Sequence, residues 1–212
     1  MNPVLPPIDP VALPAPVWVF RLLLVITFFL HVVAMDFLLG GGFLAAISGA
    51  RGRANVPHHR HMAERLSKIM PIVMAATISL GVAPLLFVQV LYGRFFYTSS
   101  ILMAVPWISV ILLLMLAYYG HYVMAMADTI HRERRLWIAW VSAFLVATIG
   151  FIYTSNFTLM MAPEKFRDLY LANRNGLRLN LGEPTLFPRY LHMMVGALAV
   201  SGLGMANPPP DR

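Results

Sequence analysis

The stretch VWVFRLLLVITFFLHVVAMDFLLGGGFLAAI, from Val17 to Ile47, decides the fold of this chain. It is an almost unbroken run of apolar residues, and about 20 residues of helix are enough to cross the hydrocarbon core of a bilayer. The run therefore predicts a membrane-spanning helix. Two ionisable side chains, His31 and Asp36, lie inside it and are followed by three consecutive glycines, Gly40 to Gly42. Because ionisable groups cost about 2.5 to 3.5 kcal/mol each to insert, they mark a ligand site, a proton path or a buried partner.

The rest of the chain has the same apolar character. Of its 212 residues, 59% are hydrophobic and only 12% are charged, a balance that a soluble domain cannot hide in one core. Four further stretches are apolar and long enough to span: Ile69 to Tyr92, Ile101 to Met126, Leu136 to Thr158, and Pro188 to Met205. We therefore expect an all-α, polytopic membrane bundle of about five transmembrane helices over residues 17–206. A proline-rich tail at residues 1–16 precedes it and a short tail at residues 207–212 follows it.

The charged residues between the spans predict an orientation. Residues 51–68 and 128–135 are rich in Lys and Arg, and the positive-inside rule assigns both segments to the cytoplasm and the N-terminus to the outside. The turn at residues 93–100 and the segment at residues 163–189 then lie outside, and part of the latter is expected as an interfacial helix. The net charge of +7 is attributed to contact with anionic lipid and not with nucleic acid, because the basic residues lie in short loops.

The histidines are the candidate ligands, since the chain has no cysteine for thiolate sites, iron–sulfur clusters or c-type haem. His31 lies mid-span, His121 near the cytoplasmic end of the third span and His192 near the outer start of the fifth, so we expect no single three-histidine metal site. Imidazole is a usual axial ligand of haem iron, and nearby glycines let a flat macrocycle approach a helix. Alternatively, the glycines allow close helix contact, and His31 is a satisfied polar contact or part of a proton relay.

Other polar residues also have two interpretations. Asp36 is rotated by about 140° from His31 on an ideal helix, so it faces another helix, where it can carry protons or bind a counter-charge. Gln89 and Arg94 bracket the outer end of the second span and belong either to an aromatic belt or to a quinone or haem-propionate contact. The remaining histidines are expected to be solvated loop residues: His58, His59, His61 and His131.

Three segments, in this order, resemble the N-terminal part of subunit I of the cytochrome bd quinol oxidases. LHVVAMDFLLGGGFLAA contains His31 and, nine residues later, Gly40, as the haem-ligating first helix of that family does. GVAPLLFVQVLYG, at residues 81–93, is similar to the end of its second helix. PRYLHMMVGALAVSG has His192 where the family's fifth helix carries the ligand of the low-spin haem b. The likeness covers most of the chain, from about Leu22 to Met205.

The resemblance implies a b-type cytochrome subunit in the bacterial inner membrane that transfers electrons from quinol to partner redox proteins. It makes His31 and His192 axial ligands of separate b haems, whose other ligands come from this chain or a partner subunit. His121 has no counterpart in the family and is either a ligand that substitutes for a missing one or a packed residue. The further candidates are Gly40 and Arg94 for cofactor contact, and Asp36 and Gln89 as catalytic residues, of which Asp36 assists proton movement.

The chain also departs from that family. Family members continue for several more helices, which supply the methionine ligand of the low-spin haem and the loop that reacts with quinol, so we do not expect this chain alone to form a complete oxidase. Gln89 stands where the family has a glutamate. The competing hypothesis is a haem-free membrane anchor or a proton- or ion-conducting subunit of a larger complex, in which Asp36 moves protons or holds helices together.

Overall fold

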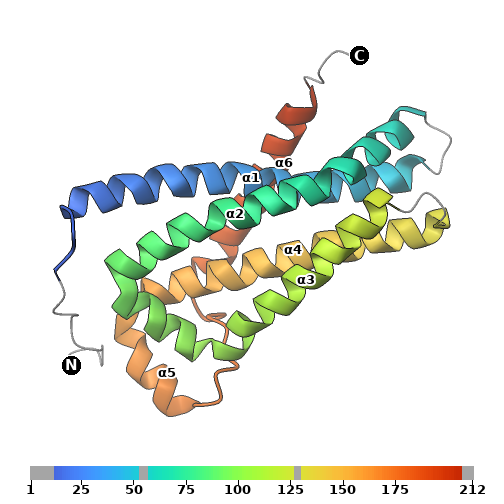
Figure 1. The fold of residues 1–212 in the computed structure, drawn as a ribbon. Coiled ribbons are helices and arrows are strands. Elements are labelled where there is room, and N and C mark those ends of the chain that lie inside the picture. The colour runs from blue at the N-terminus through green and yellow to red at the C-terminus, as the bar shows by residue number, and fades with distance from the viewer. Residues whose placement is uncertain (1–11, 53–56, 127–129, 207–212) are drawn as a thin grey trace.

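The computed structural model describes residues 12–52, 57–126 and 130–206, and within these ranges the chain is helical and forms no strand. Figure 1 shows the arrangement of its helices. In chain order they are α1 (Val17–Arg51), α2 (Pro57–Leu102), α3 (Ala104–Met126), α4 (Arg132–Met160), the short 3-10 helix η2 (Pro163–Lys165), α5 (Phe166–Ala172) and α6 (Leu186–Ala206).

Five of these helices, α1, α2, α3, α4 and α6, are long and apolar enough to cross a membrane, which confirms the predicted all-α bundle. The predicted spans all lie inside one of them, except that the third begins three residues before α3 does. Most of the N-terminal tail, residues 1–11, and the C-terminal tail, residues 207–212, lie outside the described residues. The α5 helix forms in the segment where a short helix was expected between the fourth and fifth spans.

The second helix is longer than the sequence predicted. The turn expected at residues 93–100 is wrong, because α2 runs for 46 residues and bends at Tyr92, whose φ of −130° and ψ of 23° are not helical. The helix continues directly after the bend. This is possible because the next proline is Pro106, so each residue up to it has a backbone N–H to donate. The loop expected at residues 51–68 is also wrong from residue 57 onward, since α2 begins at Pro57. His58 and His61 therefore lie exposed on a helix and not in a loop.

Three helices meet α1 at its glycine triplet, residues 40–42. Successive helical residues are rotated by about 100°, so the three glycines face three directions. Gly40 faces α6, because a methyl group there would collide with the carbonyl of Ala197. A methyl group on the second glycine would lie 2.9 Å from Cε of Met70 on α2, and one on the third 3.7 Å from Cβ of Ala143 on α4. The triplet is thus where α1 approaches all three neighbours, as small residues allow in membrane bundles.

The last helix, α6, crosses α1 instead of running alongside it (Figure 1). One stripe of α6 faces the bundle: Tyr190 donates a 3.0 Å hydrogen bond from its hydroxyl to the Ala147 carbonyl of α4, and Met193 lies against Gly150. Ala197 and Ser201, further along this stripe, are fully buried. The opposite stripe faces outward and is formed by large apolar side chains that include Leu191, Val195 and Leu198.

Polar side chains join the segment after α5 to the end of α4. The backbone N–H of Asn180 donates to Oγ of Ser155 at 2.8 Å, and its Nδ2 donates to Oγ1 of Thr158 at 3.2 Å. Between Ser155 and Thr158, Oδ1 of Asn156 accepts a 3.2 Å hydrogen bond from Oγ of Ser99 on α2. All five side chains are buried. Because buried polar groups are costly when unpaired, this network fixes α2, α4 and the following segment to one another.

Candidate functional site

The imidazole of His31 lies against α2. Its Nδ1 is 3.0 Å from the backbone carbonyl oxygen of Thr77. The ring also fills the space above Gly81, where a methyl group would stand 2.8 Å from Cε1 of the imidazole. Residues 77 and 81 are one helical turn apart and share a face of α2. The missing side chain at Gly81 therefore forms the notch in which the ring sits.

This contact determines which nitrogen of His31 carries the proton. A carbonyl oxygen can only accept, so Nδ1 is the donor, and in the neutral ring Nε2 keeps its lone pair. Within the described part of the chain, Nε2 forms no hydrogen bond. Metal-ligating histidines commonly donate their other ring N–H to a carbonyl, which fixes both tautomer and orientation. His31 is thus held in the state in which an imidazole can ligate a metal.

Asp36 lies on α1 between His31 and the glycine triplet and is half-buried. Its backbone carbonyl accepts a hydrogen bond from Oγ of Ser201 on α6 at 3.2 Å, and the same hydroxyl lies 3.3 Å from the carbonyl of Phe37. The carboxylate of Asp36 makes no hydrogen bond or ion pair to another described residue. Gly40, one turn later, permits the close approach of α6, and its face is filled by that helix.

His192 is exposed on α6. It belongs to the outward stripe, where its neighbours Leu191 and Val195 are 63% and 59% exposed. No described residue forms a hydrogen bond with its ring. An imidazole among uncovered aliphatic side chains is unusual in a membrane helix, where such groups face a bundle interior, a cavity or a partner.

His121 is the most buried of the three candidate ligands, with 4% of its surface exposed. It lies near the end of α3, next to Gly120, where α3 approaches α4 so closely that a methyl group would collide with Oγ of Ser142. No hydrogen bond joins it to another described residue. His121 is therefore an enclosed imidazole beside the α3–α4 contact, whereas His31 contacts α2.

Gln89 and Arg94 lie on either side of the bend in α2. Oε1 of Gln89 accepts a 2.8 Å hydrogen bond from the hydroxyl of Tyr97, which links the two halves of the bent helix. Arg94 is half-buried, and its Nε is buried without a hydrogen-bond partner among the described residues. Arg94 lies 13 residues after Gly81, or about 20 Å along a helix, which separates it from the His31 ring.

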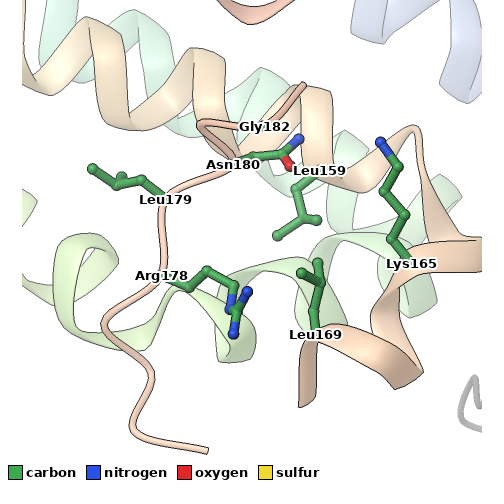
Figure 2. A pocket seen from close by; sticks show the side chains of 7 residues that line it. All are labelled: Leu159, Lys165, Leu169, Arg178, Leu179, Asn180 and Gly182. Carbon is green, nitrogen blue, oxygen red and sulfur yellow. The ribbon is translucent and has the colours of Figure 1, made fainter. Parts of the chain in front are cut away.

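A cavity of about 310 Å³ lies beside the end of α4, where the segment after α5 returns (Figure 2). Leu159 and Leu169 point toward one another across it, and the guanidinium of Arg178 lies beside Leu169. Lys165, at its edge, donates a 2.8 Å hydrogen bond from Nζ to Oε2 of Glu183. This bond raises the pKa of Lys165 and lowers the pKa of Glu183. Sequence reasoning missed this cavity, although its alternating apolar and basic residues were visible.

The structure thus does not gather the predicted site residues into one centre. Among the described residues, no three His, Asp or Glu side chains lie close enough to hold a metal ion together. Each candidate histidine has its own surroundings. The residues that position His31, namely Thr77 and Gly81, were not identified from the sequence, although Gly81 opens one of the family-like segments. The sequence signal for these two residues was their spacing of four, which places them on the same face of a helix.

No family model matches this chain, and neither the curated proteins nor the solved structures contain a match.

Proposed function

We propose that this chain is a membrane-embedded b-type cytochrome subunit that passes electrons from quinol to partner redox proteins in a bacterial inner membrane. His31 and His192 are the axial ligands of two separate b haems. The observation that carries the proposal is the state of His31, with Nδ1 bonded to the Thr77 carbonyl and Nε2 left without a described partner. Quinol as the electron donor is supported by the resemblance to the bd oxidases.

The surroundings of His31 fit an axial ligand. The carbonyl of Thr77 and the notch at Gly81 fix the ring from two directions, so its orientation does not depend on a metal. A ligand held in advance loses little rotational freedom on binding. When bound, haem b supplies the one-electron redox chemistry, and the protein tunes its potential through ligand type, hydrogen bonding and burial.

The surroundings of His192 support a ligand that is completed by a partner. Its ring lies on the outward stripe of α6, without a described hydrogen-bond partner. The N-terminal half of α1 is similarly uncovered, with Val25 and Phe29 each 65% exposed. Lipid covers aliphatic side chains well but leaves an imidazole unsatisfied. A partner subunit that brings a haem or a polar group to this face would supply the contact that the imidazole lacks.

Asp36 and Gln89 are proposed to handle protons. The Asp36 carboxylate has no described partner, so it is free to exchange a proton within the bundle. Gln89 cannot titrate, and it contributes through its hydrogen bond with Tyr97, whose hydroxyl can donate and accept. His121 and Arg94 remain candidates for additional contacts to a cofactor. The imidazole of His121 is buried, and the buried Nε of Arg94 has no hydrogen-bond partner among the described residues.

The alternative function is a haem-free anchor or ion-conducting subunit. Two observations favour it: the Thr77 carbonyl already satisfies one nitrogen of His31, and the face of Gly40 is filled by α6. Both are what a purely structural role of these residues requires. In this function, the exposed ring of His192 contacts a polar group of a partner subunit and not a haem.

The test is the visible spectrum of the purified full chain and of its His31→Ala and His192→Ala variants, expressed with haem supply. We expect reduced-minus-oxidised bands of haem b that weaken in each variant. His61→Ala is the matched control, because His61 is exposed at the far end of α2, and it should leave the bands unchanged.

A rescue experiment separates ligand loss from misfolding. In His31→Gly, the notch above Gly81 is empty, and added imidazole should restore the bands. Bands that persist at full strength in both alanine variants would refute the ligand assignment. Bands that are absent from the wild type with haem supply and partners present would favour the anchor or ion-conducting subunit.

A further inference from the structure

A second cavity, of about 290 Å³, opens at the opposite end of the bundle from the one in Figure 2. It lies where α1 ends, α2 and α4 begin and α3 ends, at the right of Figure 1. Small residues keep it open. Gly49 of α1, Gly52 directly after α1 and Ala139 of α4 line it, and a methyl group at Gly52 would stand 3.3 Å from the backbone nitrogen of Arg60.

Three arginines from two helices converge on this cavity: Arg60, Arg132 and Arg135. The Nε of Arg60 donates a 3.0 Å hydrogen bond to Oε1 of Glu64, the acidic residue among the described lining residues. One terminal nitrogen of Arg135 donates to the Met124 carbonyl at 3.2 Å, which holds its guanidinium in place. Glu64 neutralises the charge of Arg60, so the described lining keeps the two positive charges of Arg132 and Arg135.

The start of α4 strengthens this positive field. Arg132 is the first residue of α4, and the partial positive charge of a helix N-terminus favours an anion there. The positive-inside rule accounts for basic residues at this end, but it does not require that they share a cavity. Arg134 and Lys68 belong to the same two helix ends and do not line it.

We propose that this cavity binds a phosphate group, supplied either by the headgroup of an anionic phospholipid or by a soluble phosphate compound. Guanidinium groups recognise phosphate oxygens through paired, charge-assisted hydrogen bonds. The volume is close to the lower end of the range for small-molecule sites and admits a headgroup. The site does not involve haem, so a test of phosphate binding is independent of the cytochrome proposal.

The experiment compares two double variants of the full chain. Arg132→Gln/Arg135→Gln removes two charges from the cavity, and Arg134→Gln/Lys68→Gln removes two from the same helix ends outside it. Phosphatidylglycerol retained by each protein from nanodiscs of phosphatidylcholine and phosphatidylglycerol is measured by native mass spectrometry. We expect a loss of about tenfold or more in affinity for the cavity variant and little change for the control. Equal losses in the two variants overturn the proposal, and no loss in either rules out the lipid source and leaves a soluble phosphate compound.

Two additions distinguish the source of the phosphate and guard against misfolding. Sodium phosphate, titrated against sodium chloride of equal ionic strength, should raise the melting temperature of the wild type if the ligand is soluble, and phosphatidylglycerol alone should do so if it is a lipid. Stabilisation by neither overturns the proposal. Glu64→Gln removes the competing carboxylate and should tighten binding several-fold, a gain that a folding defect cannot mimic. Unchanged or weaker binding in this variant contradicts the assignment.

Discussion

Replacing Gly40 by alanine should separate α6 from α1. A methyl group at this position would collide with the Ala197 carbonyl and would stand 2.5 Å from Oγ of Ser201. The carbonyl belongs to the backbone, so it cannot move aside by changing a rotamer. Overpacking of this kind costs about 1 to 3 kcal/mol. Loss of the Ser201 hydrogen bond to the α1 carbonyls adds about 0.5 to 1.5 kcal/mol.

The same substitution also has a favourable effect, because alanine is a better helix former than glycine by about 1 kcal/mol. We therefore expect a net loss of about 2 kcal/mol in the free energy of unfolding. The assay is titration of the detergent-solubilised protein with SDS, followed by circular dichroism. Gly202→Ala is the matched control on α6, because a methyl group there meets nothing within 4 Å, and it should leave the protein as stable or more stable.

A cross-link provides a direct measure of the helix contact. The chain has no cysteine of its own, and a methyl group at Gly204 would lie 3.1 Å from the ring of Phe37. Because this contact is with the far end of the ring, Phe37→Cys/Gly204→Cys should be bridged by a short bifunctional maleimide, and the added Gly40→Ala should slow the reaction. Equal stability of the two alanine variants, with unchanged cross-linking, would refute the view that Gly40 sets the α1–α6 crossing.

Three other substitutions test separate contacts. Gly81→Ala should push the His31 ring out of its notch. The haem b bands of this variant should then weaken as in His31→Ala, although the histidine is still present. Unchanged bands would contradict the role of Gly81 in positioning the ring. Asn156→Ala should cost about 1 to 3 kcal/mol in SDS unfolding, because its buried partners lose their hydrogen bonds. Glu183 has its pKa lowered by Lys165, so the stabilisation from this pair is present above the ordinary pKa of 4.5 and is lost as the pH falls through the folded pKa. Limited proteolysis of residues 163–185 should therefore increase in acid in the wild type, and this pH dependence should be absent in Glu183→Gln.

The sequence was sufficient to predict the spans, because apolar length alone decides what can cross a bilayer. It was not sufficient to place the ends of α2. The bend at Tyr92 and the continuation of the helix directly after it depend on backbone hydrogen bonds that hydropathy does not describe. Likewise, the run of basic residues before Lys68 indicated a cytoplasmic loop, although most of it forms helix.

In the candidate site, too, the sequence predicts local helix geometry but not the contacts between helices. The angle between His31 and Asp36 on an ideal helix predicts different neighbours for the two side chains. His31 contacts α2, but the contact of Asp36 with α6 is made by its backbone carbonyl, so the neighbour of its carboxylate stays a prediction. The partners themselves, Thr77 and Ser201, depend on how helices cross and are not encoded in local spacing. The glycine triplet was visible in the sequence, but its three separate contacts follow only from the crossing of α1 with α2, α4 and α6.

The most direct test of the cytochrome proposal is a pyridine haemochrome spectrum of the wild-type chain, purified in detergent after expression with haem supply and with its membrane partners. The proposal predicts the spectrum of haem b, in an amount comparable to the protein. A protein that purifies folded and with its partners but without haem would contradict it.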